Sequence, residues 1–317
     1  MAILIDEPRW PNHGTLWAHL VSDASLSELH GFASTLGIPT RGFDHDHYDV
    51  PAHLHAAALG LGALPVSSGE LVRRLIASGL RVPARHRAPS RAAAVEDAVR
   101  RWDHLMPGHP HLGASLTGRW REPHRHYHDV RHLTQCLAAL DELTGGTPTR
   151  PVALAAWYHD AVYLGRPGQD EEAAAALAEA ELAPVVGEPE AREVARLVRL
   201  TTTHAPDPGD QSGALLSDAD LSILAVNQGR YHVYLRDVRL EYSHVPDAEF
   251  LEGRRQVVES LLGGGTLAEA PSPGRHLFHS PQGRDLWEAD ARENLQAELR
   301  SLTSDPENGW LARVTLP

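Results

Sequence analysis

Three short segments of the chain carry side chains that could bind a divalent metal ion. Four histidines fall within nine residues, namely His124, His126, His128 and His132. A His-Asp pair, His159-Asp160, follows an apolar run, and Asp218 and Asp220 lie further along the chain. Neutral imidazole nitrogens and carboxylate oxygens are common ligands of divalent ions near neutral pH. The three segments together are typical of a metal site with mixed nitrogen and oxygen ligands.

The spacing of these side chains suggests how they are used. On a helix that begins near Tyr127, His128 and His132 are four residues apart and share one face. One of them could bind metal while the other faces a substrate, although a solvated histidine pair has the same spacing. His159 and Asp160 end the apolar run 152–158. Burying both side chains beside a core is unfavourable unless a partner such as a metal ion satisfies them.

Most of the chain beyond residue 91 shows the apolar spacing of amphipathic helices. The predicted helices are 92–105, 128–143, 152–162, 171–181, 188–203, 215–224, 228–241, 247–262 and 286–302. The segments 144–151 and 205–213 contain Gly and Pro and indicate loops between helices. We therefore expect helices to position the candidate ligands.

The first 82 residues show short apolar runs that alternate with helical segments. Strands are predicted at 2–6, 39–43 and 64–66. Helices are predicted from Asp23 or Ser25 to 36, at 52–61 and at 68–79. Residues 83–91 lose the apolar period and gain Pro and Arg, which is typical of a linker. The sequence thus predicts an α+β chain with a small α/β domain at 1–82, a linker at 83–91 and an all-α domain at 92–317.

The composition limits the classes of partner and compartment. The 42 acidic residues exceed the 29 basic ones and give a net charge of −13. This charge argues against nonspecific nucleic-acid binding but is compatible with a small anionic substrate. The single cysteine, Cys136, excludes an intramolecular disulfide and a cysteine-rich zinc site. No signal-peptide core and no stretch of ~18 apolar residues is found, so we expect a soluble cytoplasmic protein without membrane contact.

Several segments in order resemble the HD-domain metal-dependent phosphohydrolases, whose signature is a histidine, a later His-Asp doublet and a distal aspartate. The matching residues are His132, His159-Asp160 and Asp220. Residues 92 to 305 look more narrowly like a bacterial subgroup of predicted HD phosphohydrolases, through segments 125–128, 157–163, 217–224 and 239–247. The resemblance implies that residues 92–317 form an HD-type domain. It also implies that the four matching residues bind one or two divalent ions of Mn, Fe, Co, Ni or Zn.

The resemblance further implies roles for individual side chains. The Tyr-His-x-x-x-His spacing that ends at His132 is similar to that of cyclic nucleotide phosphodiesterases. In those enzymes the first histidine protonates the leaving oxygen and the second binds metal. Carried over, His128 is the candidate general acid and His132 a ligand, with the reverse assignment left open. Asp160 is a candidate for both metal binding and catalysis, and Asp218 is the alternative to Asp220.

Five further residues complete the predicted site. Glu171 matches a subgroup glutamate that could bind a water or a second metal, or it stabilises a helix N-terminus. His204 ends a predicted helix and could face the site, or it only stabilises that helix end. Arginines could grip a substrate phosphate with two nitrogens, with surface salt bridges as the alternative. The candidates are Arg125, Arg239 and Arg254, of which Arg125 is adjacent to the metal motif.

The first 82 residues resemble a small bacterial family known as a domain of unknown function, DUF4031. Segments 5–10, 17–23, 28–30 and 43–49 carry this resemblance, which brings no activity with it. Asp6 at a strand end and the His- and Asp-rich segment 44–49 could form a second polar site, or the segment is a solvated turn. No glycine-rich phosphate loop follows the first strand, which disfavours a dinucleotide-binding fold.

Three hypotheses about function follow. The leading one is a metal-dependent phosphoric ester hydrolase that acts on a small phosphorylated partner, a phosphomonoester or phosphodiester and above all a nucleotide. A divalent metal would polarise a phosphoryl oxygen and activate water, and an acid would protonate the leaving oxygen. The alternatives are an HD-type di-iron oxygenase and a noncatalytic nucleotide-sensing module. The sequence identifies neither the substrate nor the oligomeric state.

Overall fold

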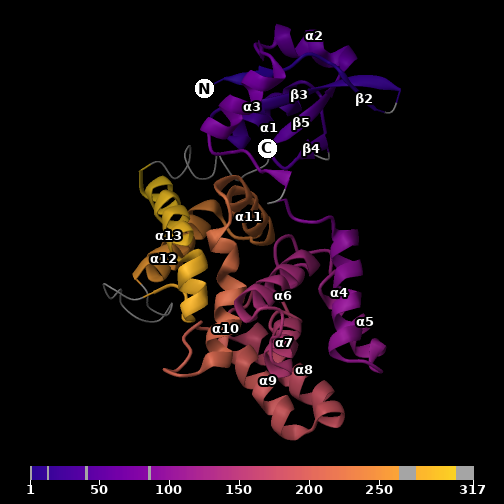
Figure 1. Ribbon diagram of the computed structural model, residues 1–317. Helices are drawn as coiled ribbons and strands as arrows, with labels where there is room; N and C mark the ends of the chain where they lie inside the picture. The colour runs from indigo at the N-terminus through magenta and orange to yellow at the C-terminus, as the bar shows by residue number, and fades with distance from the viewer. Residues whose placement is uncertain (1, 13, 40–41, 85–86, 264–275, 305–317) are drawn as a thin grey trace. The chain divides into compact units, whose positions relative to one another are not determined.

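The computed structural model describes residues 2–12, 14–39, 42–84, 87–263 and 276–304 (Figure 1), and the chain divides into two compact units. The first, the sheet unit, is Met1–Arg87 with Val226–Leu240 and Arg300–Pro317. The second, the helical unit, is Ala88–Ala225 with Glu241–Leu299. The fold is mixed α+β, with a small N-terminal sheet followed by a mostly helical region, and 63% of the structure is helical.

The sheet has the strand order β4-β5-β3-β1-β6, and β2 pairs with β3. Its strands are β1 (Ile3–Ile5), β2 (Trp10–Asn12), β3 (Thr15–Ser22), β4 (Phe43–Asp44), β5 (His47–Pro51) and β6 (Leu64–Pro65). Neighbours are antiparallel except β1 and β6. Three helices accompany the strands: α1 (Leu26–Thr35), α2 (Ala52–Gly60) and α3 (Ser68–Ala77). Their apolar side chains share one core with Leu4, Ile5 and Leu20 of the sheet.

Three strands lie where the sequence analysis predicted none: β2, β3 and β5. In β3, Ala18 and Leu20 are fully buried, whereas Trp17 and His19 are only partly buried. The alternation has the period of two that defines a strand, but the intervening polar and aromatic side chains obscured it. Part of the strand predicted at 39–43 lies outside the described residues, and β4 begins at Phe43. The described sheet is mainly antiparallel, because β1 and β6 are its one parallel pair.

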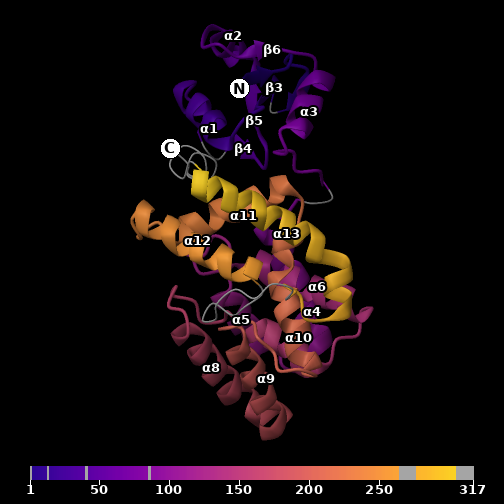
Figure 2. The same ribbon diagram turned by 90° about the vertical axis from the view of Figure 1, so that its left-hand side faces the viewer.

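Helices make up most of the remaining described chain. They are α4 (Arg91–Leu105), α5 (Pro110–Arg119), α6 (Val130–Thr144), α7 (Arg150–Tyr158), α8 (Gln169–Val186), α9 (Glu188–Leu200), α10 (Gln211–Asp220), α11 (Gln228–Glu241), α12 (Asp247–Gly263) and α13 (Pro281–Ser304). A short 3₁₀ segment, Leu221–Ala225, follows α10. Helices α8 and α9 lie side by side (Figure 2), and α6, α7 and α10 pack against one another. Among the described helices, none is both long and apolar enough to span a bilayer.

The core of the helical unit is built around buried tryptophans. Trp102, Trp120 and Trp157 are each at most 1% exposed. The indole Nε1 of Trp120 donates a hydrogen bond to the Trp157 carbonyl at 2.9 Å, so the start of the His159-Asp160 segment is tied to the core. Such a packed interior moves little, which is the property a site needs from its supporting helices.

The predicted start of the helix that carries His132 is wrong by two to three residues. Asp129 has an extended backbone, and its side chain accepts a hydrogen bond from the Arg131 amide at 2.8 Å, which makes it the N-cap of α6. His128 therefore precedes the helix instead of sharing a helical face with His132. The two rings still approach each other, with 5.6 Å between their centroids.

Candidate metal centre

Four side chains from three helices of the helical unit converge on one point. His132 lies in the first turn of α6, His159 caps the end of α7 and is followed by Asp160, and Asp220 is the last residue of α10. The Nε2 atoms of His132 and His159 are 3.2 Å apart. Asp220 Oδ1 lies 3.0 Å from His132 Nε2 and 3.6 Å from His159 Nε2. Asp160 Oδ2 lies 3.3 Å from His159 Nε2. These four residues, which the sequence analysis selected, we call the helical cluster.

The surroundings orient the two imidazoles. His159 Nδ1 donates to the Ala156 carbonyl at 2.8 Å, which leaves Nε2 as the nitrogen that can bind an ion. His132 packs beside the Tyr127 ring, with 4.8 Å between the centroids. The side chains of His132 and His159 are at most 1% exposed, whereas those of Asp160 and Asp220 are 16% and 15% exposed. Solvent or a ligand can thus reach the cluster from the carboxylate side.

The charges in the helical cluster compensate one another. Burial alone would raise the pKa of Asp160 and Asp220, but the neighbouring His159 holds both well below their usual range. Burial opposes the charge on His159, yet Asp160 and Asp220 raise its pKa well above the ordinary value. Two ionised carboxylates beside two imidazoles suit a divalent cation, which would replace the imidazole protons because metal binding requires neutral rings. The donor set of two nitrogens and two oxygens fits Mn, Fe, Co, Ni or Zn.

Cys136 is a further neighbour that the sequence analysis did not place in the site. One ligand atom from each of His132, Cys136, His159 and Asp220 lies within 4.8 Å of the others. Burial raises the pKa of the Cys136 thiol well above its ordinary value, and Asp220 adds to that effect. Since thiolate is the binding form, the protonated thiol is a weaker candidate than the carboxylates. Its spacing of four residues from His132 on α6 is the signal that could have revealed it.

The two aspartates of α10 have different surroundings. Asp220 lies in the helical cluster, whereas Asp218 is fully buried and accepts three hydrogen bonds from another segment. These come from the His279 amide at 2.6 Å, the Ser280 amide at 2.8 Å and the Ser280 hydroxyl at 2.5 Å. Asp218 thus anchors the start of the segment that leads into α13, and Asp220 is the aspartate that faces the histidines.

His128 lies beside the helical cluster and is held by Glu241, at the end of α11. Its Nδ1 is 2.6 Å from Glu241 Oε2. The other oxygen, Oε1, accepts from the amides of residues 126, 127 and 128 at 2.8–2.9 Å. The Tyr163 ring stacks on His128 with 4.3 Å between centroids, and its hydroxyl also donates to Glu241. Glu241 therefore fixes both the ring and the backbone of the predicted acid.

The same contact sets the charge of His128. Burial lowers the pKa of its imidazole, but the adjacent Glu241, together with Asp160 and Asp220, raises it above the ordinary value. Correspondingly, although burial opposes its ionisation, Glu241 has a pKa of about 2 because of His128 and the backbone amides. Sequence reasoning did not assign Glu241 a role, since 113 residues separate it from His128 and a lone glutamate gives no local signal.

Arg125 lies under the site instead of on its surface. Its side chain is 0% exposed. The guanidinium donates to the carbonyl oxygens of His128 at 3.0 Å and Asp160 at 2.7 Å, and it ion-pairs with Glu122. These bonds hold the two backbone segments of the site together. A phosphate could bind this guanidinium only by displacing one of the acceptors, so the predicted phosphate role remains a prediction.

His204 is the other predicted residue that the structure brings to the helical cluster. Its Nε2 lies 3.5 Å from Asp220 Oδ2, and its Nδ1 lies 3.2 Å from the Ser217 hydroxyl. The backbone at His204 has a φ of 49°, an uncommon left-handed conformation for a residue other than glycine. His279 Nε2 donates to the His204 carbonyl at 2.8 Å, which helps to maintain this turn.

Three predicted residues have other contacts. Glu171 accepts from the Gly168 amide at 2.5 Å in a capping arrangement at the start of α8. Arg254 of α12 forms a two-pronged ion pair with Glu298 of α13, at 2.8 and 3.0 Å. Arg239 lies in the part of α11 that belongs to the sheet unit. The substrate-binding roles of these arginines remain predictions.

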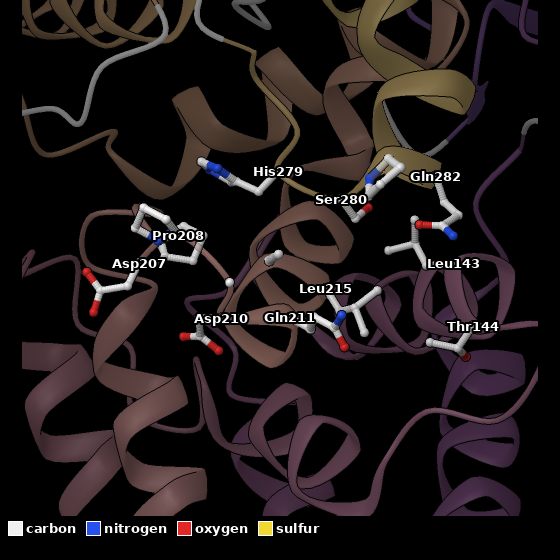
Figure 3. Close-up of a pocket in the computed structure, with 14 residues that line it drawn as sticks. Leu143, Thr144, Asp207, Pro208, Asp210, Gln211, Leu215, His279, Ser280 and Gln282 are labelled. Atoms are coloured by element: carbon white, nitrogen blue, oxygen red, sulfur yellow. The ribbon is translucent and has the colours of Figure 1, made fainter.

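A pocket of about 580 Å³ lies next to α10 in the helical unit (Figure 3). Figure 3 shows Asp207 and Asp210 on one side and Leu143 and Thr144 on the other, with His279 and Ser280 along the rim. No member of the helical cluster lines this pocket. The link between them is His279, which lines the pocket and donates to the His204 carbonyl. The pocket is therefore separate from the candidate metal ligands.

Comparison with known proteins identifies only the N-terminal part of the chain. Residues 3–78 match the family described as "Protein of unknown function (DUF4031)", which confirms the resemblance seen in the sequence. No curated protein and no solved structure matches the chain. Residues 3–78 therefore form a DUF4031 domain.

Proposed function

We propose that the helical unit is a metal-dependent hydrolase of phosphoric esters, as its resemblance to HD phosphohydrolases suggests. The observation that carries the proposal is the convergence of His132, His159, Asp160 and Asp220 from three helices, with their ligand atoms 3.0–3.7 Å apart. The Nε2 atoms of the two buried imidazoles are 3.2 Å apart, and neutral imidazole nitrogens are common ligands of divalent ions. A bound divalent ion supplies a polarising charge for a phosphoryl oxygen and lowers the pKa of water.

The side chains around the helical cluster fit the proton transfers that ester hydrolysis needs. His128 holds a proton because Glu241 stabilises its cationic form, and Nδ1 is taken by that glutamate. Nε2 is then the nitrogen that would donate a proton to a leaving oxygen. A positioned acid of this kind contributes about 10²–10⁴-fold to a rate. Arg125 acts through the backbone of His128 and Asp160 and is a positioning residue in this proposal.

The substrate class we propose is a phosphomonoester or phosphodiester, with nucleotides as the first candidates. The test uses the purified full chain, stripped with a chelator and reloaded separately with Mn²⁺, Fe²⁺, Co²⁺, Ni²⁺ or Zn²⁺. Each form is assayed against aryl phosphate mono- and diesters and against linear and cyclic nucleotides. Activity should disappear on chelation and return with at least one ion.

Matched variants connect any activity to the helical cluster. Asp160→Ala should lower kcat/KM by about 100- to 1000-fold, the usual effect of losing a key electrostatic group. Asp103→Ala, an exposed aspartate of α4, is the control and should leave kcat/KM unchanged. Activity that survives both chelation and Asp160→Ala contradicts the proposal. Oxygen uptake with two irons per chain, or tight nucleotide binding without turnover, would replace it by the oxygenase or the sensor.

Glu241→Gln tests the acid. Because Glu241 raises the pKa of His128, the alkaline fall of kcat should move to lower pH in this variant. The expected loss is about tenfold at alkaline pH, typical of a lost orienting carboxylate, and smaller at acidic pH. An unchanged pH profile would remove His128 from the role of acid.

A further inference from the structure

The sheet unit has its own pocket, of about 350 Å³, whose lining includes Asp44, His47 and Asp49 of the segment 44–49. Its polar lining comes from β3, from β4 and β5, and from the segment after α3. The charged and imidazole side chains in this lining are His19, Asp44, His47, Asp49, Arg81 and Arg87. Apolar residues of α3, among them Leu71 and Leu75, close the remaining wall.

Strand pairing brings three of these side chains to one place. His19 on β3 is the direct partner of Asp49 on the antiparallel β5. His47 is two residues before Asp49, and residues two apart on a strand point to the same face. One ligand atom from each of the three lies within 4.8 Å of the others, and His47 Nε2 is 3.6 Å from Asp49 Oδ1. His19, His47 and Asp49 are called the sheet cluster below.

Each histidine of the sheet cluster is held by a buried carboxylate through Nδ1. His19 Nδ1 is 3.2 Å from Asp6 Oδ2, and His47 Nδ1 is 2.7 Å from Asp46 Oδ1. The side chains of both aspartates are 0% exposed. An ionised carboxylate only accepts hydrogen bonds, so the hydrogen sits on Nδ1 of each ring. In the neutral rings, Nε2 then carries the lone pair that can bind an ion.

The two carboxylates are themselves fixed from behind. Asp6 accepts hydrogen bonds from the His19 amide at 2.6 Å and the Ser68 hydroxyl at 2.7 Å. Asp46 accepts from the Val82 amide at 2.6 Å and pairs with Arg81 at 3.0 Å. Histidines that bind metal in proteins typically have such a partner on the other nitrogen, and the partner is typically hydrogen-bonded in turn. An ordinary solvated turn would not need two buried aspartates to orient neighbouring rings.

We propose that the DUF4031 domain binds a divalent transition ion through His19, His47 and Asp49. Two nitrogens and one oxygen form an incomplete shell, which is typical of sites that keep positions open for water or a ligand. The side chain of Asp49 is 50% exposed and that of His19 is 30% exposed, so the open side faces the pocket and solvent. The site is independent of the hydrolase proposed for the helical unit.

The test measures Co²⁺ binding to the metal-free full chain by visible absorption, which reports a bound ion without any assay of activity. Measurements are made in the Asp160→Ala background, where the helical cluster lacks one carboxylate, and again in the wild type. In both backgrounds His47→Gln and Asp49→Asn should weaken one Co²⁺ site by at least about tenfold. His53→Gln, which changes an exposed histidine of α2, should leave that site unchanged.

Using both His47→Gln and Asp49→Asn separates a loss of Co²⁺ binding from a loss of folding. His47 is buried, so His47→Gln could disturb the sheet, but Asp49 is half-exposed and Asp49→Asn should keep the wild-type melting temperature. A loss of Co²⁺ binding in a folded Asp49→Asn protein supports the site. Equal Co²⁺ binding by Asp49→Asn and His53→Gln overturns it. Complete loss of Co²⁺ binding from Asp160→Ala alone also overturns it, because all binding would then belong to the helical cluster.

Discussion

The helical and sheet clusters use the same residue types in two different ways. In the helical cluster, His132 and His159 are at most 1% exposed, and the carboxylates lie directly against their Nε2 atoms. In the sheet cluster, the orienting carboxylates, Asp6 and Asp46, lie behind the rings on the Nδ1 side. In the helical cluster the candidate ligands therefore compensate one another's charge. In the sheet cluster the histidines are paired with carboxylates that are not candidate ligands.

This difference determines how an ion would couple to stability. Buried ion pairs are costly to desolvate, and removing one partner leaves an uncompensated charge. An ion at the helical cluster would take over compensation that the side chains now supply for each other, so binding and folding are linked there. At the sheet cluster the histidines are already satisfied on one side, and the other side faces a pocket. We expect an ion there to exchange readily and to add little to the stability of the domain.

The largest expected effect separates the two aspartates of α10. Asp220→Asn should weaken metal binding at the helical cluster by at least about 100-fold, since even indirect partners of a metal site cost about 10–100-fold. Asp218→Asn should retain the metal but lower the free energy of unfolding by about 2–4 kcal/mol, because its buried carboxylate accepts three hydrogen bonds. Calorimetric metal titration and urea unfolding of both variants measure these effects.

Each outcome has a clear opposite. If Asp218→Asn loses the metal and Asp220→Asn retains it, the distal ligand is Asp218 and the geometry at α10 must change on binding. If both variants leave the metal affinity of the helical cluster unchanged, neither aspartate binds the ion, and the proposed difference between the helical and sheet clusters is wrong. Neither variant should change Co²⁺ binding at the sheet cluster.

The sequence predicted most of the helices, because amphipathic periodicity is a local signal, but it missed α5. The prediction of 228–241 matches α11, and 92–105 and 247–262 each differ from α4 and α12 by one residue at one end. Strands β2, β3 and β5 were missed because the predicted strands were continuous apolar runs, whereas β3 and β5 carry His19, His47 and Asp49 between apolar residues. The residues that form the sheet cluster thus obscured the strands that position it.

The helical cluster was predictable in its members but not in its surroundings. His132, His159, Asp160 and Asp220 were chosen from motif order, and the structure brings them together. The same motif gave no way to find Glu241, whose contact with His128 depends on how distant segments of the unit pack. It made Arg125 the candidate phosphate-binding arginine, but it could not show that the guanidinium is buried against acceptors such as the Asp160 carbonyl.

Histidine outside the clusters provides a second contrast, in pH dependence. In the sheet unit, burial and the positive charge of Arg236 lower the pKa of His30 to about 4. The residue is 2% exposed, Nδ1 lies 2.7 Å from the Tyr48 hydroxyl, and Nε2 has no hydrogen-bond partner among the described residues. In the helical cluster the pKa of His159 is shifted in the opposite direction. His204, whose pKa burial lowers, resembles His30 in this respect.

The sheet unit should therefore lose stability in acid. The unfolded chain protonates His30 below its ordinary pKa of 6.5, while the folded domain does so only near about 4. Stability is complete above 6.5 and is lost as the pH falls through this window, by about 2 kcal/mol at pH 5. His159 causes no loss of folding stability between pH 6.5 and pH 5, because a group with a raised pKa stabilises the folded state at low pH. Hydrogen exchange of the β3 amides at pH 7 and pH 5, corrected for intrinsic rates, measures the change.

The variant His30→Phe should remove most of this pH dependence, and His53→Phe should keep it. Phenylalanine suits the aromatic surroundings, since the His30 ring lies 4.5 Å from Phe43 and 5.5 Å from Tyr48. If His30→Phe and the wild type lose protection equally between pH 7 and pH 5, another group causes the acid sensitivity of the sheet unit.

The smallest expected effect marks the limit of the helical cluster. Glu171 accepts a hydrogen bond from the Gly168 amide, and burial raises the pKa of its carboxyl. If Glu171 acts only as a helix cap, Glu171→Ala should lower the free energy of unfolding by about 0.5–1 kcal/mol. Glu171→Gln should keep the hydrogen-bond acceptor and most of the stability. Neither variant should change kcat. If the Glu171 carboxylate binds an ion or its water, both variants should lower kcat, because the neutral amide of Glu171→Gln cannot replace the carboxylate. A tenfold fall in kcat for Glu171→Gln, with unchanged stability, would make Glu171 the outer carboxylate that the sheet cluster has in Asp6 and Asp46.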